Sequence, residues 1–440
     1  MGLFTGRNRD FAKFRNILLS RVNEERRRTM DTGTPFLRSQ PFTRERVTQV
    51  IAQDGDALSK ELNSLRHELY APEAKKTLRS FTSGEAAKLI GVGDGYLRQL
   101  SLAGKGPQPT IGHSNRRSYT LEQINELRRL LDEGAKNKKY LPHRSGGEHC
   151  QVIAVANFKG GSGKTTTAAH LAQYMALQGY RVLAVDLDPQ ASLTALHGYQ
   201  PEMDIEADST IYGAIKYEGA RKPLTEIVRK TYFPGLDLVP GNIELQEYEH
   251  EAPRFMSEIH GGRFWDRIAN ALASVENDYD VMILDCPPQL GYITLGALCA
   301  ATSLLITVHP QMLDVMSMCQ FLQMAAALLE VVQDAVNKNS GGAEIALEYD
   351  FLRYAVTRFE PNDGPQNWTA ALMRTLFRER VLNSPILKST AIEAAGLSKQ
   401  TLYEVSRDDF TRSTYDRAIE SLESMGSEIQ TLMKKAWGRE

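Results

Sequence analysis

The chain has 440 residues, too many for one ordinary domain, and its 42% hydrophobic and 24% charged residues are typical of a globular protein in water. No secretory leader and no run of about 18 apolar residues is evident, so we expect a cytoplasmic protein and no membrane partner. The four cysteines form no C-x-x-C pair, which argues against a zinc site. The net charge of −2 conceals an asymmetry, because residues 1–150 carry 27 Lys and Arg against 17 Asp and Glu, whereas residues 151–440 carry 25 against 37. A basic front half predicts an anionic partner for that half.

Residues 1–75 are predicted to form an N-terminal helical segment that could dimerise. Within residues 1–30, apolar residues such as Phe11, Phe14 and Leu18 recur at helical spacing among many arginines, which predicts an amphipathic helix. A basic tail without regular structure is the alternative for this stretch. One or two further helices are expected in residues 43–70.

Residues 76–134 are predicted to form a helix-turn-helix domain. Thr82 with Glu85 three residues later predicts a capping box at the start of a short helix, and Asp94 can cap a second helix after the turn "GVGD". A hairpin is expected over residues 107–120 with "HSNRR" at its tip, followed by a third helix. The arrangement resembles a MerR-type winged helix, which implies that the second helix enters a DNA major groove. A unit that docks another protein is the alternative. The candidate DNA contacts are Tyr96, Arg98 and Gln99 on the second helix, and Arg116 and Arg117 at the hairpin tip.

A basic linker (135–149) separates this domain from the last one (150–440), which is predicted to be an α/β domain. Its apolar runs alternate with helical stretches, which is typical of a mostly parallel sheet flanked by helices. An amphipathic helix is predicted over residues 165–178 and a C-terminal helix after residue 410. The predicted strands lie in "QVIAVANF" (151–158), "RVLAVDLD" (181–188) and residues 236–241, 280–288, 303–310 and 352–359.

A glycine-rich loop joins the first of these strands to the first helix. Gly160, Gly161 and Gly163 allow backbone amides to turn toward a phosphate, and the helix that follows adds its positive N-terminal end. Lys164 is expected to reach the terminal phosphates, and the Thr165 hydroxyl to bind Mg²⁺. The usual G-x-x-x-x-G-K-[ST] pattern would place a glycine at position 158, where Phe158 stands. A second lysine, Lys159, lies within the loop instead.

Acidic residues follow two of the predicted strands, where a Mg²⁺ site needs them. Asp186 and Asp188 end "VLAVDLD", and Asp285 ends "VMILD". Carboxylates at neighbouring strand ends hold Mg²⁺, usually through water. A guanine-specific N-K-x-D is missing, because "NKNS" (337–340) lacks the Asp, so ATP is favoured over GTP.

The segment K-G-G-x-G-K-T-T, residues 159–166, resembles the deviant phosphate loop of the ParA/MinD ATPase family, and "VLAVDLDPQASLT" and "VMILDCPPQLG" resemble its next two motifs. The resemblance implies a homodimer in which Lys159 reaches the partner's ATP. It also implies that Asp188 positions the attacking water, that Lys159, Lys164 and Asp188 are catalytic, and that Thr165, Asp186 and Asp285 serve Mg²⁺. The nucleotide-binding residues implied are Lys159, Gly160, Gly161, Ser162, Gly163, Lys164, Thr165 and Thr166.

Further segments, including "RFEPNDGPQNWT" and "LKSTAIEAAGLSKQTLYEV", are similar to the partition ATPases of RepABC replicons in alphaproteobacteria. The resemblance implies a weak Mg²⁺-dependent ATPase, associated with the nucleoid and stimulated by DNA and by a ParB-like centromere-binding partner (RepB). It also implies repression of its own operon through the winged helix. Non-specific DNA binding by the ATPase dimer has five basic candidates: Arg358, Arg378, Arg380, Lys388 and Lys399.

Three other functions are weighed against this one. A membrane-cycling ATPase of the MinD type would use the C-terminal "LMKKAWGRE" as an amphipathic anchor, but the winged helix argues against it. A transcription factor with a degenerate ATPase is disfavoured by the intact Lys164, Thr165, Asp188 and Asp285. An iron–sulfur reductase lacks a suitable second ligand beside Cys286.

Overall fold

The computed structural model describes residues 46–69, 76–112, 116–135, 140–258, 263–339 and 346–439. The chain divides into two compact units, Met1–Lys76 and Thr77–Glu440. The described part of the first unit is one helix, α2 (Val47–Leu69). The amphipathic helix predicted in residues 1–30 lies outside the described residues.

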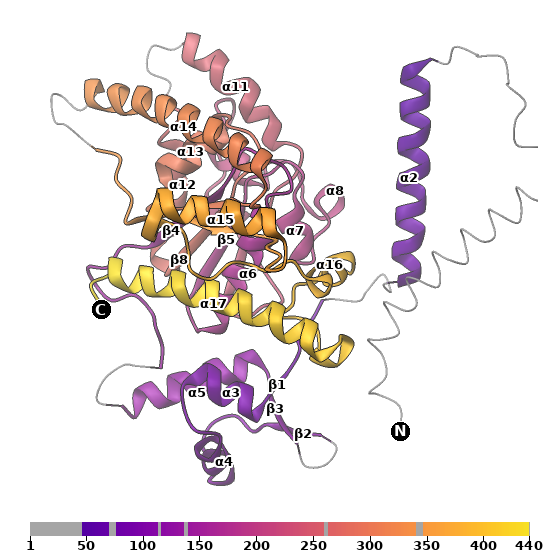
Figure 1. Ribbon diagram of the computed structural model, residues 1–440, viewed down its shortest axis with the longest axis vertical. Coiled ribbons are helices and arrows are strands. Elements are labelled where there is room, and N and C mark those ends of the chain that lie inside the picture. The colour runs from indigo at the N-terminus through magenta and orange to yellow at the C-terminus, as the bar shows by residue number, and fades with distance from the viewer. Residues whose placement is uncertain are drawn as a thin grey trace, which may run out of the picture. The chain divides into compact units, whose positions relative to one another are not determined.

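The second unit begins with a small helical and hairpin region that follows the predicted order of elements (Figure 1). Its three strands form an antiparallel sheet in the order β1-β3-β2. Two helices joined by a short turn precede the hairpin, and a third helix follows it. Residues 113–115 of the hairpin tip lie outside the described residues. The bounds are β1 Phe81–Thr82, α3 Ser83–Ile90, α4 Asp94–Leu102, β2 Thr110–Ile111, β3 Arg117–Tyr119 and α5 Leu121–Glu133.

Local capping sets where two of these helices begin. The Glu85 amide donates to the Thr82 hydroxyl over 3.3 Å, and the Thr82 amide donates to the Glu85 carboxylate over 2.8 Å, which is a complete capping box. Thr120 starts α5 through a second capping box. The expected cap at Asp94 is wrong, because Gly93 occupies the N-cap position of α4 and the Asp94 carboxylate accepts a hydrogen bond from Ser83 instead.

The rest of the second unit is built on a seven-stranded sheet in the order β10-β9-β4-β8-β5-β7-β6. Every pairing is parallel except that of β6 with β7 at one edge. The predicted fold class, a mostly parallel sheet flanked by helices, is therefore confirmed. The strands are β4 Gln151–Ala156, β5 Val182–Asp186, β6 Arg229–Lys230, β7 Leu236–Val239, β8 Val281–Asp285, β9 Ser303–Val308 and β10 Phe351–Val356.

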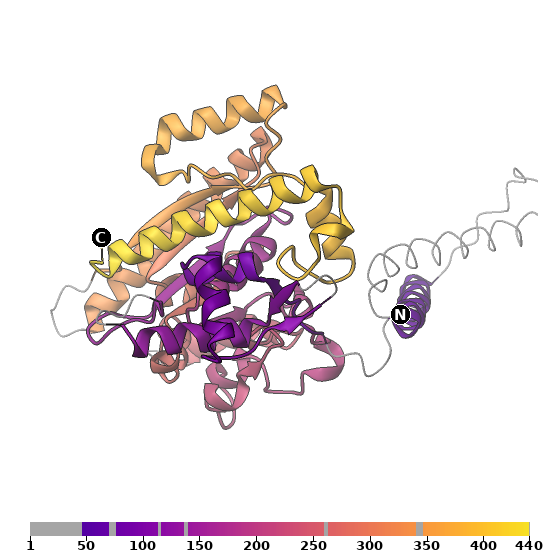
Figure 2. The ribbon, with the colours of Figure 1, turned by 90° about the horizontal axis from the view of Figure 1, so that it is seen from below.

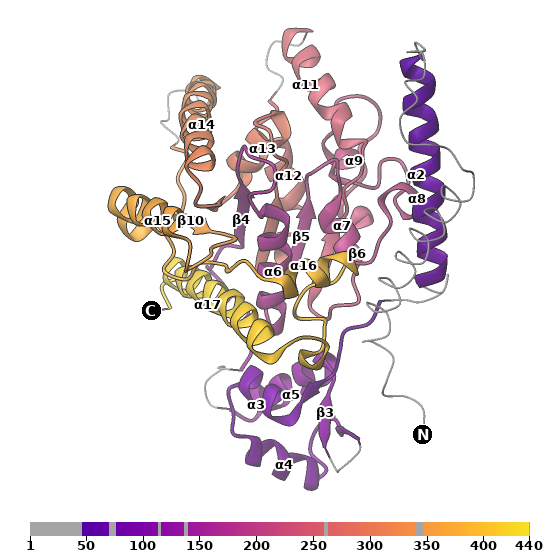
Figure 3. The same ribbon diagram turned by 45° about the vertical axis from the view of Figure 1, so that its right-hand side comes forward.

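Helices cover both faces of this sheet (Figures 1 and 3). Ile153 and Val155 of β4 pack into a core with α6 (Lys164–Leu177), α16 (Thr390–Leu397) and α17 (Arg412–Ala436). The alternate residues of β4 face a second core. The helices of that core are α9 Ile211–Ile215, α10 Leu224–Ile227, α11 Leu245–Glu258, α12 Arg267–Ala273, α13 Tyr292–Ala300, α14 Met312–Asn339 and α15 Gly364–Phe377. Two short helices, α7 Ser192–Leu196 and α8 Pro201–Asp204, and short 3-10 turns at 276–278, 378–380 and 407–409 complete the unit.

The helix after the phosphate loop, α6, is not amphipathic as predicted. Residues on all its sides are buried, from Lys164 and Thr167 to Leu177. The sheet covers one side, and α17 packs against another (Figure 3). The structure therefore corrects the predicted two-sided pattern, because α6 lies in the middle layer of the unit.

One helix is more apolar than the sequence analysis expected. Over Met312–Lys338, α14 is long and apolar enough to cross a membrane by length and composition alone, which is weak evidence for a span. Only part of it is buried, and Met312, Leu313 and Met316 near its start are exposed. Polar residues such as Asp314, Gln320 and Glu330 interrupt the segment, so it is apolar on average and not an uninterrupted apolar run.

The small helical region packs directly on the α/β part of the same unit (Figure 2). Arg128 of α5 is fully buried and donates to the carbonyl oxygens of Leu89, in the last turn of α3, and of Leu177, the last residue of α6, over 2.7 and 2.6 Å. Lys88 forms an exposed ion pair with Glu423 of α17. The two regions share one hydrophobic core, and Arg128 lies where they meet.

Candidate nucleotide site

The loop between β4 and α6 has a backbone that requires glycine at two points. Gly161 has φ 77° and Gly163 φ 85°, values that residues with a Cβ rarely adopt. A Cβ on Gly163 would also lie 3.4 Å from the Cβ of Thr357. The distance to Thr357 is an ordinary contact, so it is the backbone conformation of the turn that requires the glycines.

Side chains from three strand ends hold the loop in place. The Thr357 hydroxyl donates to the Ser162 carbonyl oxygen over 2.7 Å, and the Ser162 and Thr307 hydroxyls are 3.1 Å apart. Asn157 donates to the Thr307 carbonyl oxygen and accepts the Lys159 amide over 3.2 Å. These bonds fix the backbone amides before any phosphate binds, which lowers the entropic cost of binding.

Lys164 lies at the N-terminus of α6 with only 6% of its surface exposed. Its ammonium donates to the Lys159 carbonyl oxygen over 3.1 Å. Burial lowers the pKa of Lys164, and the charges of Asp285 and Asp188 oppose that shift. A buried cation beside a helix N-terminus and glycine amides is a site for a phosphate anion.

Asp285 is a buried carboxylate without a well-placed hydrogen-bond donor in the described part of the chain, which is a typical environment for a cation ligand. It ends β8 directly opposite Asp186 of β5, and it is fully buried. Neither of its carboxylate oxygens accepts a hydrogen bond of good geometry among the described residues. Burial and the neighbouring Asp186 raise its pKa, while Thr165 and Lys164 act in the opposite direction. The orphaned carboxylate next to Thr165 fits a Mg²⁺ ion.

Asp186 differs from Asp285, because its oxygens are already engaged. One oxygen accepts the amide and the hydroxyl of Thr194 over 2.8 and 2.7 Å, and the other accepts the Asp188 amide over 3.2 Å. Gly241 packs so closely that a Cβ there would lie 2.9 Å from the Asp186 carboxyl carbon. Asp186 thus orients the half-buried Asp188, and its predicted Mg²⁺ role stays a prediction. Thr194 and Gly241 were not among the predicted site residues, although Gly241 ends the strand predicted over residues 236–241.

The ammonium of the second lysine of the loop contacts another element of the unit. Lys159 forms an ion pair with Asp314 of α14, which also accepts from His309 over 3.1 Å. The Asp314 side chain is 8% exposed, against 38% for Lys159. In a single chain the Lys159 ammonium is therefore held outside its own phosphate loop. Its action on a partner's nucleotide stays a prediction.

Arg358, predicted as a non-specific DNA contact, lies against the phosphate loop. Its guanidinium donates to the Gly161 carbonyl oxygen over 3.3 Å, and its φ of 51° is rare for a residue with a side chain. Lys388 is paired with Glu360 over 2.9 Å. Arg378 and Arg380 form a short turn after α15, and Lys399 follows α16. DNA binding by this group stays a prediction.

The candidate DNA contacts of the small helical region share a surface. Tyr96 is 44% exposed, and Arg98 and Gln99 are also exposed, whereas Leu97 and Leu100 of the same helix are buried. The Arg117 guanidinium donates to the Arg98 carbonyl oxygen over 3.5 Å, so the hairpin lies beside α4. Arg116 is exposed next to it. Contact of these five residues with DNA stays a prediction.

No group of three or more His, Cys, Asp or Glu suited to a metal ion occurs in the part of the chain that the structure describes. A Mg²⁺ ion at Asp285 and Thr165 would therefore share its coordination with nucleotide phosphates and water, as Mg²⁺ commonly does.

We expect Asp285→Asn to stabilise the nucleotide-free protein at pH 8. The raised pKa of Asp285 means that ionisation costs folding free energy as pH rises from its unfolded value, near 4, through its folded value. Removing an unpaired buried charge should raise the free energy of unfolding by about 1–3 kcal/mol at pH 8, and by less at lower pH. Thermal unfolding with EDTA between pH 5 and 8 measures this, and Mg²⁺-dependent ATP hydrolysis should be lost.

Asp280→Asn is the matched control. Asp280 is also buried, but Arg181 and backbone amides hydrogen-bond it and its pKa is lowered, so its replacement should destabilise the protein. A loss of stability on Asp285→Asn would contradict the assignment of an unsatisfied carboxylate.

Comparisons with known proteins show the family to which the chain belongs. Residues 150–339 match a family model described as an AAA domain. A putative replication protein A of Rhizobium rhizogenes is 51% identical over 396 residues, which cover 89% of this chain and 96% of the relative. Protein SopA of Escherichia coli strain K12 is 30% identical over 379 residues, 83% and 92% of the two chains. A solved structure named "Partition Protein" has a TM-score of 0.55 at 20% identity, covering 85% and 98%, and shows the same fold.

The matches at 51% and 30% identity cover 89% and 83% of this chain, so they reach well beyond the phosphate loop. The cofactors of the site are ATP and Mg²⁺, consistent with the loop, Lys164 and the unsatisfied Asp285. The chain belongs to the ParA-type partition ATPases, in the group of replication protein A (RepA) from RepABC replicons.

Proposed function

We propose that this protein segregates its replicon through an ATP-dependent homodimer that binds DNA without sequence preference. A ParB-like centromere-binding partner (RepB) would stimulate hydrolysis and release the dimer from DNA, so that hydrolysis is weak without partner and DNA. The observation that carries the proposal is the position of Lys159, beside a complete phosphate loop yet directed away from it.

The residues of the loop have distinct tasks in this proposal. Lys164 and the backbone amides of the loop bind the phosphates, and Thr165 with Asp285 holds Mg²⁺, which neutralises phosphate charge when bound. Asp188, whose backbone is fixed by Asp186, orients the attacking water. Catalysis in this class rests on positioning and electrostatics, so these contacts must be preorganised.

The surface beside Lys159 suits contact with a second copy of the chain. Asp314 lies at the start of α14, and Met312, Leu313 and Met316 around it are 55%, 71% and 59% exposed. Exposed apolar groups next to a charged loop are typical of an interface core. In the dimer, Lys159 would leave Asp314 and contact the partner's ATP.

The small helical region would serve a second role as the repressor of the operon. The exposed Arg98, Gln99 and Tyr96 on α4 would read bases, and Arg116 and Arg117 would contact the DNA backbone; their exposure supports this role. We place the protein in the cytoplasm on the nucleoid and assign it no membrane partner.

The test of the function is binding to random-sequence duplex DNA with ATP, ADP or no nucleotide, over a salt titration. We expect binding with ATP and Mg²⁺ only, with an affinity that falls steeply as salt rises, because several phosphates must be neutralised. Binding to one specific operator in every nucleotide state, with none to random DNA, would make the protein a regulator rather than a partition ATPase.

Lys159→Ala should retain ATP binding within about threefold, because its ammonium does not contact its own loop's phosphate site. It should lose ATP-dependent dimerisation and partner-stimulated hydrolysis, the latter by at least tenfold. Analytical ultracentrifugation with ATP and a phosphate-release assay measure the two effects. Lys230→Ala, at an exposed lysine on β6, is the control. Wild-type behaviour of Lys159→Ala in both assays would show that the lysine does not act across a dimer.

A further inference from the structure

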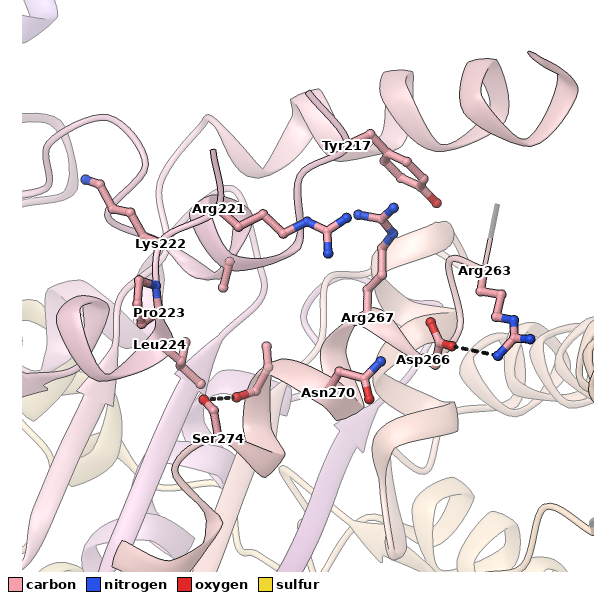
Figure 4. A pocket seen from close by; sticks show the side chains of 12 residues that line it. Tyr217, Arg221, Lys222, Pro223, Leu224, Arg263, Asp266, Arg267, Asn270 and Ser274 are labelled. Carbon is pink, nitrogen blue, oxygen red and sulfur yellow. Dashed lines mark hydrogen bonds and ion pairs between the residues drawn. The ribbon is translucent and has the colours of Figure 1, made fainter. Parts of the chain in front are cut away.

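A second concave site lies away from the phosphate loop, between α9, α10 and α12 (Figure 4). Its volume is about 500 Å³. None of the nucleotide-site residues lines it. Its polar wall contains Arg221, Lys222, Arg267 and Asn270, and Leu224 and Ala271 contribute to its apolar wall.

The cavity carries an excess of positive charge. Four of its twelve lining residues are cationic and one, Asp266, is acidic. The Asp266 carboxylate forms an ion pair with Arg263 over 3.9 Å. Among the described residues, no carboxylate forms an ion pair with Arg221 or Arg267. Figure 4 shows the two guanidinium groups pointing toward each other.

Backbone carbonyl oxygens hold both arginines in this arrangement, although Arg221 is exposed and Arg267 is half-buried. Arg267 donates to the carbonyl oxygens of Ile215 and Lys216 over 2.7 and 3.0 Å, and its guanidinium lies 3.5 Å from the centre of the Tyr217 ring. Arg221 donates to the same Lys216 carbonyl oxygen over 3.0 Å. Burial, and next the charge of Arg267, lower the pKa of Arg221. Two like charges fixed side by side are unfavourable until an anion lies between them.

We propose that this cavity binds a small phosphorylated ligand, with its phosphate between Arg221 and Arg267. Guanidinium groups bind phosphate through paired hydrogen bonds, and their geometry matches it better than that of an ammonium. A cavity of about 500 Å³ exceeds the size of a phosphate ion and lies within the range of small-ligand sites, roughly 300–1,000 Å³. The apolar wall suits the remainder of a nucleotide-sized molecule. This site is separate from the ATP site and does not depend on the proposed function.

The test is calorimetric titration of the full-length protein, saturated with ADP and Mg²⁺ so that the phosphate loop is filled. The probes are inorganic phosphate and AMP. We expect saturable binding of one AMP per chain, and at least tenfold weaker binding by Arg221→Gln. Because Arg267 also holds the 215–216 turn, Arg267→Gln is the second variant, checked by its thermal unfolding. Arg254→Gln, at an exposed arginine paired with Glu218 outside the cavity, is the matched control and should bind as the wild type does.

Three results would overturn the proposal. The first is no saturable binding of either probe up to about 10 mM, far above the affinity of a specific site. The second is binding that Arg221→Gln leaves unchanged. The third is loss of duplex-DNA binding by Arg221→Gln with no binding of AMP or phosphate, which would assign the arginines to the DNA backbone instead.

Discussion

Lys164→Ala should weaken ATP binding by at least 100-fold. The ammonium is buried at the N-terminus of α6, and in this site it is placed to make charge-assisted hydrogen bonds to the nucleotide phosphates. Each such bond contributes about 1.5–3 kcal/mol, so the loss of two corresponds to roughly 100-fold or more in affinity. Calorimetric titration with a non-hydrolysable ATP analogue and Mg²⁺ measures the change, and hydrolysis should fall below detection.

The fold should survive this substitution. Lys164 is buried, and burial lowers its pKa more than the charges of Asp285 and Asp188 raise it, so we expect its removal to leave the nucleotide-free protein at least as stable. Lys230→Ala provides a control for the loss of one lysine, since Lys230 is exposed and paired with Asp237. A decrease of less than tenfold in ATP affinity would mean that the loop amides and the α6 N-terminus bind the phosphates without Lys164.

Where interactions are local in the chain, the sequence predicted the structure well. The capping boxes at Thr82 and Thr120 involve residues three positions apart, and both occur. Strands β5 and β8 were identified from continuous apolar runs, which fully buried parallel strands require, although they end at Asp186 and Asp285, two and three residues before the predicted bounds. The glycines of the phosphate loop were identified for the same local reason.

Contacts between distant segments could not be predicted in this way. The partner of Lys159 is Asp314, about 150 positions away, and no spacing rule connects them. Thr194 and Gly241 meet at Asp186 only because β5 and β7 are neighbours in the sheet. The prediction of an amphipathic α6 failed because a helix in a middle layer is buried on all sides. The spacing of its apolar residues therefore does not reveal which side faces solvent.

Arg128 is another such residue, and its chemistry is unusual. It is fully buried with no carboxylate partner among the described residues, and burial lowers its pKa to about 10. What stabilises its charge is the meeting of two helix C-termini, since Leu89 and Leu177 offer carbonyl oxygens in the last turns of α3 and α6. Asn125 accepts a third hydrogen bond over 2.6 Å. One guanidinium group at this junction therefore donates hydrogen bonds to the terminal carbonyl oxygens of both helices.

Arg128→Met should therefore lower the free energy of unfolding by roughly 2–5 kcal/mol. Two buried carbonyl groups would lose their donor, at about 1–3 kcal/mol each, and the saved desolvation of one guanidinium offsets only part of that loss. The same loss should free the small helical region from α6, so that protease cleaves the 135–149 linker sooner. Denaturant unfolding and limited proteolysis measure the two effects. Arg129→Met, at the exposed neighbouring position, should change neither. Equal behaviour of the two variants would mean that the shared hydrophobic core, and not Arg128, holds the helical region on the ATPase.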